Sequence, residues 1–198
     1  TAYGTKHVFP EYNATHILCN LRLRRNLIQG VHASHGNEAV PTDLDYPYWK
    51  YGLPDGVVVV PFDTGEKIIA IREWLPGPNA TYLKLIGETM RAGEDALTAA
   101  KRGLREETGY ISNHWELLSS ILENSGKSDR LIHIVLAQNC TRISDEEEGI
   151  EVTVLPPAEF WKCLTEYLAP SMGSAIRGGG NTLKGAALAF AHLGLWKF

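Results

Sequence analysis

The stretch that decides the fold runs from Gly87 to Tyr110 and reads G-E-T-M-R-A-G-E-D-A-L-T-A-A-K-R-G-L-R-E-E-T-G-Y. Gly93-Glu94 opens a predicted helix that continues to Thr108, and Gly109 is its predicted C-terminal stop. Apolar residues recur at helical spacing within it and predict one apolar face: Ala96, Leu97, Ala100 and Leu104.

Two adjacent carboxylates, Glu106 and Glu107, lie near the end of this helix. They repel each other and lie near the negative end of the helix dipole, so a cation would stabilise them. Position 103 precedes them by three and four residues and shares their helix face. A divalent metal with hard oxygen ligands, Mg²⁺ or Mn²⁺, is one interpretation. A solvated acidic helix end that pairs with Arg102 and Arg105 is the other.

The flanking segments predict a sheet. Val57–Pro61 is a β-branched run typical of a strand buried on both faces, and Lys67–Trp74 completes a hairpin with it. Ile17–Ile28 alternates leucines with arginines, which predicts a half-buried strand near the N-terminus. The remaining predicted strands are 82–86, 115–123, 131–138 and 150–155, and the remaining predicted helices are 157–167 and 181–195.

The spacing of Glu94, Arg102, Leu104, Glu106-Glu107 and Gly109 resembles the Nudix box. Several flanking segments resemble the ADP-ribose pyrophosphatase branch of that superfamily: 55–61 with 69–74, Asn124–Asp129, Asp145–Ile150 and Asn181–Ala187. The resemblance implies an α/β Nudix fold, in which a mixed sheet lies between helices. It also implies an N-terminal β arm over 1–54 that builds a homodimer, and a catalytic domain over 55–198.

The resemblance further implies hydrolysis of a diphosphate linkage with Mg²⁺ or Mn²⁺, which neutralises the phosphates and activates water. Carried over by position, Glu106 and Glu107 would hold the metal and the Gly87 carbonyl would complete its shell. Glu146 or Glu148 would be the catalytic carboxylate of the acidic loop. Glu94 would pair with Arg102, a structural role.

The chain departs from the Nudix pattern at four positions. Glu88 stands where the box opens with glycine, and Gly103 stands where it has a metal-binding glutamate. Lys84 and Leu75 replace a glutamate and an arginine that the branch tends to carry. Gly103 removes a metal carboxylate and, as a mid-helix glycine, costs roughly 1 kcal/mol relative to alanine.

Two readings of these departures remain open. In the first, Glu88 reaches across Gly103 and supplies the missing carboxylate, so it joins the catalytic residues. In the second, Lys84 and Glu88 form an ion pair that replaces the metal, and the pocket binds a ligand or supports metal-free chemistry. Three residues are candidates for substrate binding: Arg72 for phosphate, Trp74 for a flat ring, and Lys84. The alternatives are an exposed strand arginine and a tryptophan packed in the core.

Composition excludes several classes. The chain has 198 residues, of which 44% are hydrophobic and 21% charged, so it is neither disordered nor built for a membrane. A net charge of −4 argues against a nucleic-acid partner. Three scattered cysteines and the absence of a signal-peptide pattern predict a reduced, cytoplasmic protein.

The leading functional hypothesis is Mg²⁺-dependent hydrolysis of a nucleoside diphosphate linked to a sugar, such as ADP-ribose. One rival is a Nudix-fold enzyme repurposed for another substrate or for metal-free chemistry. The other rival is a non-catalytic nucleotide-binding or regulatory protein, although residues 1–54 are too short and too little basic for a DNA-binding domain.

Overall fold

The computed structural model describes residues 53–75, 79–125, 128–165 and 179–196. Asp55–Ile121 and Leu131–Phe198 form one compact unit, and the fold described here is that of this unit. The predicted strand Ile17–Ile28 and almost all of the predicted arm lie outside the described residues. The arm and the homodimer therefore stay predictions.

A mixed sheet forms the centre of the unit, and the described residues contribute eight strands to it. The strand order along the main path is β3-β2-β1-β7-β5, with β4 paired to β1, β6 to β7 and β8 to β2. The strands are β1 (Gly56–Asp63), β2 (Ile68–Leu75), β3 (Ala80–Lys84), β4 (Ile86–Thr89), β5 (Tyr110–Ile111), β6 (His114–Leu122), β7 (Leu131–Arg142) and β8 (Glu151–Leu155).

Strand β1 is central and is buried on both faces, as its β-branched run predicts. It pairs in parallel with β7 and antiparallel with β2 and β4. Because side chains alternate along a strand, Val57 and Val59 join the core on one face, while Val58 and Val60 join the core on the other. A sheet with two apolar faces must be covered by another layer on each side.

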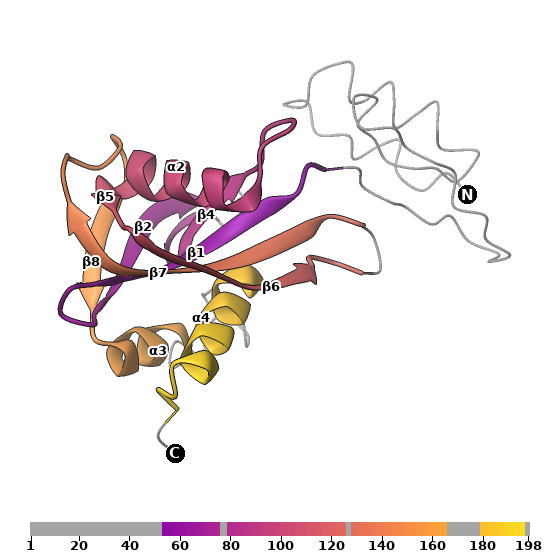
Figure 1. Cartoon of the computed structure of the whole chain (residues 1–198). Helices are drawn as coiled ribbons and strands as arrows, with labels where there is room; N and C mark the ends of the chain where they lie inside the picture. Colours follow the sequence, from indigo (N-terminus) through magenta and orange to yellow (C-terminus); the bar gives the residue numbers. More distant parts are fainter. Residues whose placement is uncertain (1–52, 76–78, 126–127, 166–178, 197–198) are drawn as a thin grey trace, which may run out of the picture. The chain divides into compact units, whose positions relative to one another are not determined.

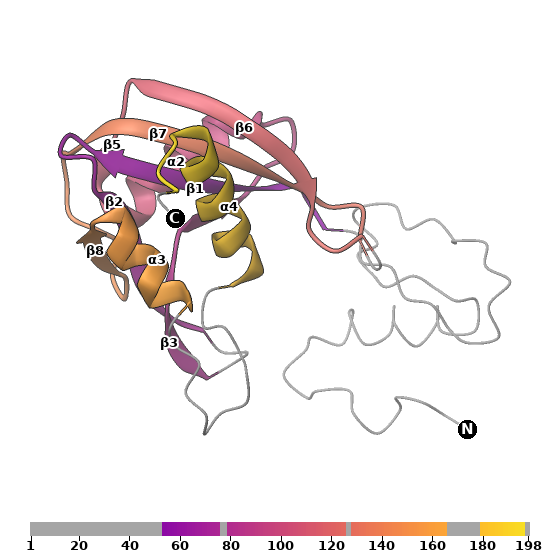
Figure 2. The same ribbon diagram turned by 90° about the horizontal axis from the view of Figure 1, so that it is seen from below.

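Helices supply these two layers (Figures 1 and 2). Helix α2 (Ala96–Thr108) covers the face of Val57 and Val59 through Ala99, Ala100 and Leu104. Helices α3 (Pro157–Thr165) and α4 (Gly180–His192) cover the opposite face through a separate apolar cluster. The predicted α/β architecture, a mixed sheet between helices, is confirmed.

The predicted single strand over 82–86 is wrong. The chain turns at Leu85, so that β3 pairs with β2 while β4 pairs with β1. The local sequence does not show this switch, because neither glycine nor proline marks Leu85 and apolar residues continue on both sides of Lys84. Its consequence is that Ile86 packs in the core beneath α2, and Glu88, two residues further along β4, points to the same side.

Both ends of α2 are capped. The Asp95 carboxylate accepts hydrogen bonds from the backbone N–H groups of Leu97 and Thr98, each 3.0 Å long, so the helix begins just after the predicted Gly93-Glu94 start. At the other end Gly109 adopts φ 71° and donates its N–H to the Arg105 carbonyl. The predicted glycine stop is confirmed.

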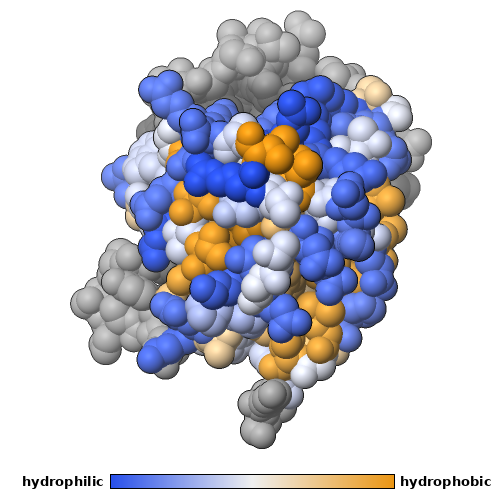
Figure 3. All heavy atoms as spheres, turned by 60° about the vertical axis from the view of Figure 1, so that its left-hand side comes forward, coloured by the Kyte–Doolittle hydropathy of each residue, from blue (hydrophilic) through white to orange (hydrophobic). Residues whose placement is uncertain are grey.

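None of the helices in the described residues is both long and apolar enough to cross a bilayer. On the face that carries the β5 and β8 end of the sheet, apolar side chains form patches bordered by hydrophilic ones (Figure 3). Trp74 is one of the exposed large side chains, at 55% of its full exposure, so it does not pack in the core.

Substituting Gly109 tests the packing at the end of α2. A Cβ at this position would lie 2.1 Å from the Ser144 carbonyl oxygen, and its φ is positive. We expect Gly109→Ala to lower the free energy of unfolding by about 3 kcal/mol or more.

Gly93→Ala is the control, because Gly93 also has positive φ but nothing lies within 4 Å of its Cβ position. Urea unfolding of both variants should separate a loss of about 1 kcal/mol at Gly93 from the larger loss at Gly109; equal losses would refute the close approach of Ser144.

Candidate functional site

An acidic pocket of about 440 Å³ lies where β2, β3 and β4 meet the C-terminal half of α2. The loop between β7 and β8, residues 143–150 and here called the acidic loop, closes another side. The volume suits a small-molecule ligand. The residues that line it are Glu73, Trp74, Lys84, Gly87, Glu88, Glu106, Glu107, Glu147, Glu148, Gly149 and Ile150.

Most of the side chains predicted from sequence come together here, although they belong to four separate segments. Two of them do not line the pocket. Arg72 lies across from Glu151 on the neighbouring strand β8, with 3.9 Å between Nε and Oε1. Glu146 pairs with Arg142 at the end of β7. The predicted residues that do line the pocket are Trp74, Lys84, Gly87, Glu88, Glu106, Glu107 and Glu148.

Sequence reasoning missed two glutamates of the pocket, Glu73 and Glu147. Glu73 accepts a hydrogen bond from the ammonium group of Lys84, so the one cationic side chain among the described lining residues is paired. The register of β2 with β3 sets this pair, since Ile71 lies opposite Lys84 and Glu73 lies two residues beyond. Glu147 is exposed and adjoins the predicted Glu146 and Glu148 in the acidic loop, whose path no periodicity reveals.

Arg102 connects α2 to the segments that precede it, and only 13% of its side chain is exposed. Its Nε and Nη2 donate to the two carboxylate oxygens of Glu94, at 3.0 and 2.9 Å, and Nη2 also donates to the Thr89 carbonyl. The predicted Glu94–Arg102 pair is confirmed. These hydrogen bonds, with one from the Arg91 backbone N–H, lower the pKa of Glu94 to about 2. The joint between loop and helix is thus held by a bidentate ion pair.

Glu88 also reaches Arg102, and this arrangement separates the two readings left open by the sequence. Its Oε2 lies 2.6 Å from Nη1 of Arg102, and its Oε1 accepts the Thr89 backbone N–H. Glu106 lies 3.6 Å from the same Nη1, so the two carboxylates share one guanidinium group. The Lys84–Glu88 ion pair of the second reading is absent, because Lys84 pairs with Glu73.

Glu107 is the least satisfied carboxylate of the pocket. Its Oε2 atom is buried and has no hydrogen-bond partner. Burial raises its pKa to about 8, Lys84 opposes that shift, and the nearby carboxylates Glu88, Glu73 and Glu147 add to it. A buried, unpartnered carboxylate oxygen is costly, so this atom favours a proton or a cation.

Comparison with known proteins places these features in a family. The model of the NUDIX domain family matches residues 52–177, well over half of the chain. The chain belongs to the NUDIX domain family. It is 26% identical over 118 residues to the methanol dehydrogenase activator of Bacillus methanolicus, and 27% identical over 104 residues to the ADP-ribose pyrophosphatase of Bacillus subtilis. These regions cover 57% and 50% of this chain, and 64% and 56% of the two relatives.

A solved structure supports the fold of this NUDIX domain. The crystal structure of an ADP compounds hydrolase matches 71% of this chain and 72% of its own, with a TM-score of 0.59 and 22% identity. The TM-score shows that the two chains share a fold. The predicted Nudix fold and the predicted likeness to ADP-ribose pyrophosphatases are therefore confirmed.

The donor groups of the acidic pocket fit the divalent cation that a NUDIX domain implies. Its titratable lining consists of six glutamates and one lysine, and carboxylate oxygens suit Mg²⁺ or Mn²⁺. The buried Oε2 of Glu107 lacks the partner that a cation would provide. Within the described residues, however, no three acidic, histidine or cysteine side chains converge on a common point. Glu88 and Glu106 point to Arg102 instead.

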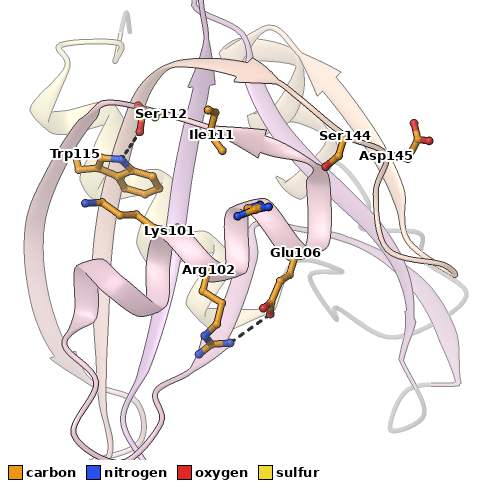
Figure 4. A pocket seen from close by; sticks show the side chains of 9 residues that line it. Lys101, Arg102, Glu106, Ile111, Ser112, Trp115, Ser144 and Asp145 are labelled. Atoms are coloured by element: carbon orange, nitrogen blue, oxygen red, sulfur yellow. Dashed lines mark hydrogen bonds and ion pairs between the residues drawn. The ribbon is translucent and has the colours of Figure 1, made fainter.

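A second and larger groove, of about 730 Å³, lies along α2, beside β5, the start of β6 and the acidic loop (Figure 4). Lys101, Arg105 and Trp115 line it, and the Trp115 indole donates to the Ser112 carbonyl. Glu106 lines both this groove and the acidic pocket, so it stands at the edge between them. The groove lacks the cluster of six glutamates that lines the smaller pocket.

The raised pKa of Glu107 predicts a pH dependence of stability. Between about pH 4.5 and pH 8 the folded protein keeps the proton that the unfolded chain releases, so stability falls as pH rises through this window. We expect a loss on the order of 2–3 kcal/mol between pH 4.5 and pH 7 in the presence of chelator. Glu107→Gln should abolish this component, whereas Glu159→Gln, on the exposed side of α3, should keep it. Urea unfolding against pH measures the slopes; identical slopes in all three proteins would contradict the assignment.

The bidentate pairing of Arg102 predicts that lysine cannot replace it. Arg102→Lys keeps the charge but cannot bind both oxygens of Glu94 while contacting Thr89 and Glu88. We expect a loss of about 1–3 kcal/mol in the free energy of unfolding. Arg105→Lys, an exposed position on the same helix, is the matched control and should change stability by less than about 0.5 kcal/mol. The prediction fails if both substitutions have the same small effect.

Proposed function

We propose that this NUDIX domain hydrolyses the diphosphate linkage of a nucleoside diphosphate sugar, with ADP-ribose as the first substrate to test, and that it does so with Mg²⁺ or Mn²⁺. One observation carries the proposal: six glutamates and one already paired lysine surround the pocket. A diphosphate carries negative charge of its own and would be repelled by such a pocket. Divalent cations between carboxylates and phosphates remove this conflict.

The similarity to relatives supports the same class of substrate. The Bacillus subtilis relative is an ADP-ribose pyrophosphatase, and the solved structural neighbour is an ADP compounds hydrolase. Trp74 is exposed at the pocket, so its ring face is accessible for stacking on a flat base. This contact would recognise the nucleoside end of the substrate.

In this proposal the residues of the chain divide the work. Glu106 and Glu107, with Glu88, would hold the cation, which when bound neutralises phosphate charge and makes water a better nucleophile. Glu147 and Glu148 are exposed carboxylates on the acidic loop and face the same pocket, so either can take the proton of the attacking water. Arg102 would keep α2 and β4 in register, so that carboxylates of both elements face one ligand.

The decisive experiment is hydrolysis of ADP-ribose with Mg²⁺, with Mn²⁺ and with EDTA, followed by chromatography of AMP. We expect metal-dependent AMP release that Glu107→Gln lowers by about 100-fold or more. Of Glu147→Gln and Glu148→Gln, the one that removes the base should lower kcat by about 100-fold to 10,000-fold. Glu159→Gln, away from the pocket, serves as the charge-matched control.

Two outcomes would replace the proposal by its rivals. Thermal stabilisation by ADP-ribose without any AMP release would identify a nucleotide-binding protein that is not a hydrolase. AMP release that persists in EDTA and in Glu107→Gln would identify metal-free chemistry. Other nucleoside diphosphate sugars, tested in parallel, separate an inactive pocket from one of different specificity.

A further inference from the structure

Gly103 occupies a position where glycine is unfavourable. It lies in the interior of the 13-residue helix α2 and is buried against the sheet. A Cβ built there would lie 3.0 Å from Cβ of Glu88, 3.4 Å from Cγ of Glu88 and 3.5 Å from a methyl group of Ile86. The space that another residue would fill is therefore occupied by the stem of the Glu88 side chain.

Glu88 enters this space because of the pleat of β4. Ile86 packs beneath α2, and the side chain two residues later emerges on the same face. Its carboxylate ends between the Thr89 backbone N–H and the Arg102 guanidinium, and 21% of the side chain is exposed. It lines the acidic pocket together with Glu106 and Glu107.

We propose that Gly103 and Glu88 act as one unit, in which the absent side chain at position 103 seats a carboxylate from β4 beside Glu106 and Glu107. In this unit the third carboxylate of the cation site would come from strand β4 instead of helix α2, and Glu88 would exchange its contact with Arg102 for one with the cation. This inference deepens the proposed function and rests on its cation site.

The geometry of α2 explains why a carboxylate at position 88 can stand in for one at position 103. Residue 103 precedes Glu107 by one helical turn, so a carboxylate on residue 103 would share the face of Glu107. Glu88 brings its carboxylate to this face from across the helix–strand interface. A side chain at 103 would crowd the Glu88 stem, because its Cβ would lie only 3.0 Å from Cβ of Glu88 and the stem would have to shift. Gly103 is a positioning residue, and Glu88 would touch the cation.

The first test measures this crowding alone. Alanine favours a helix over glycine, so Gly180→Ala in α4, where the added Cβ meets nothing within 4 Å, should raise Tm slightly. Gly103→Ala should give no such gain in the parent, but it should raise Tm by about 2–4 °C when introduced into Glu88→Gly, where the stem is gone. An equal rise in both backgrounds would overturn the seating of Glu88.

The second test measures the cation directly, by titration of Mn²⁺ with detection of the free ion by electron paramagnetic resonance. We expect Glu88→Gln and Glu88→Gly to weaken binding by about tenfold or more. The exchange variant, Glu88→Gly with Gly103→Glu, should regain most of that affinity, because the carboxylate returns from the helix side. Glu159→Gln controls for the loss of one negative charge and should bind as the parent does.

The outcomes separate this inference from the proposed function. If Mn²⁺ binding depends on Glu88 but ADP-ribose is not hydrolysed, the inference holds and the proposed function fails. If ADP-ribose is hydrolysed with metal while Glu88→Gln binds Mn²⁺ as tightly as the parent, the proposed function holds and the inference is overturned. An unaltered parent that binds no Mn²⁺ would overturn both.

Discussion

The arrangement of the acidic pocket depends on the contacts of one guanidinium group, that of Arg102. It binds both oxygens of Glu94 before the helix, the Thr89 carbonyl at the end of β4, and the Glu88 carboxylate within that strand. Because the group is mostly excluded from water and each contact has an ionic or carbonyl partner, this junction fixes helix α2 relative to β4. Carboxylates of α2 and β4 therefore face one pocket. Hydrogen bonds within the helix or within the strand alone would not bring them together.

Two glycines allow α2 to approach its neighbours more closely than side chains would permit. At Gly103 the helix leaves room for the stem of Glu88, and at Gly109 the backbone of Ser144 passes where a Cβ would be. The first glycine lowers helix propensity, and the second requires a left-handed conformation. Both unfavourable glycines lie beside the pocket. The Gly109 carbonyl oxygen also accepts hydrogen bonds from the start of the acidic loop, so its position affects the path of that loop. The local loss of stability is thus linked to the geometry of the pocket.

The electrostatics of the pocket are unbalanced, and its chemistry follows from this imbalance. Lys84 is neutralised by Glu73, and Arg102 is shared by several carboxylates. Burial raises the pKa of Glu107 to about 8, and the nearby carboxylates add to the shift, while its Oε2 has no hydrogen-bond partner. Protonation and a bound cation relieve the same repulsion. A cation, unlike a proton, also attracts the phosphates of an incoming substrate, which is why the proposed hydrolase is the function this arrangement favours.

The sequence alone determined the elements with local signals: the doubly buried β1, the helix α2 and its glycine stop. These depend on periodicity and on backbone preferences, which a short window contains. The spacing of the glutamates also identified the family and drew attention to Glu88 and Gly103. Only the tertiary structure decided which carboxylates meet. It divided the predicted strand over 82–86 in two, left Glu146 outside the pocket and brought in two other glutamates. Strand register and loop path set these contacts, and both depend on pairing between residues far apart in the chain, which no local pattern records.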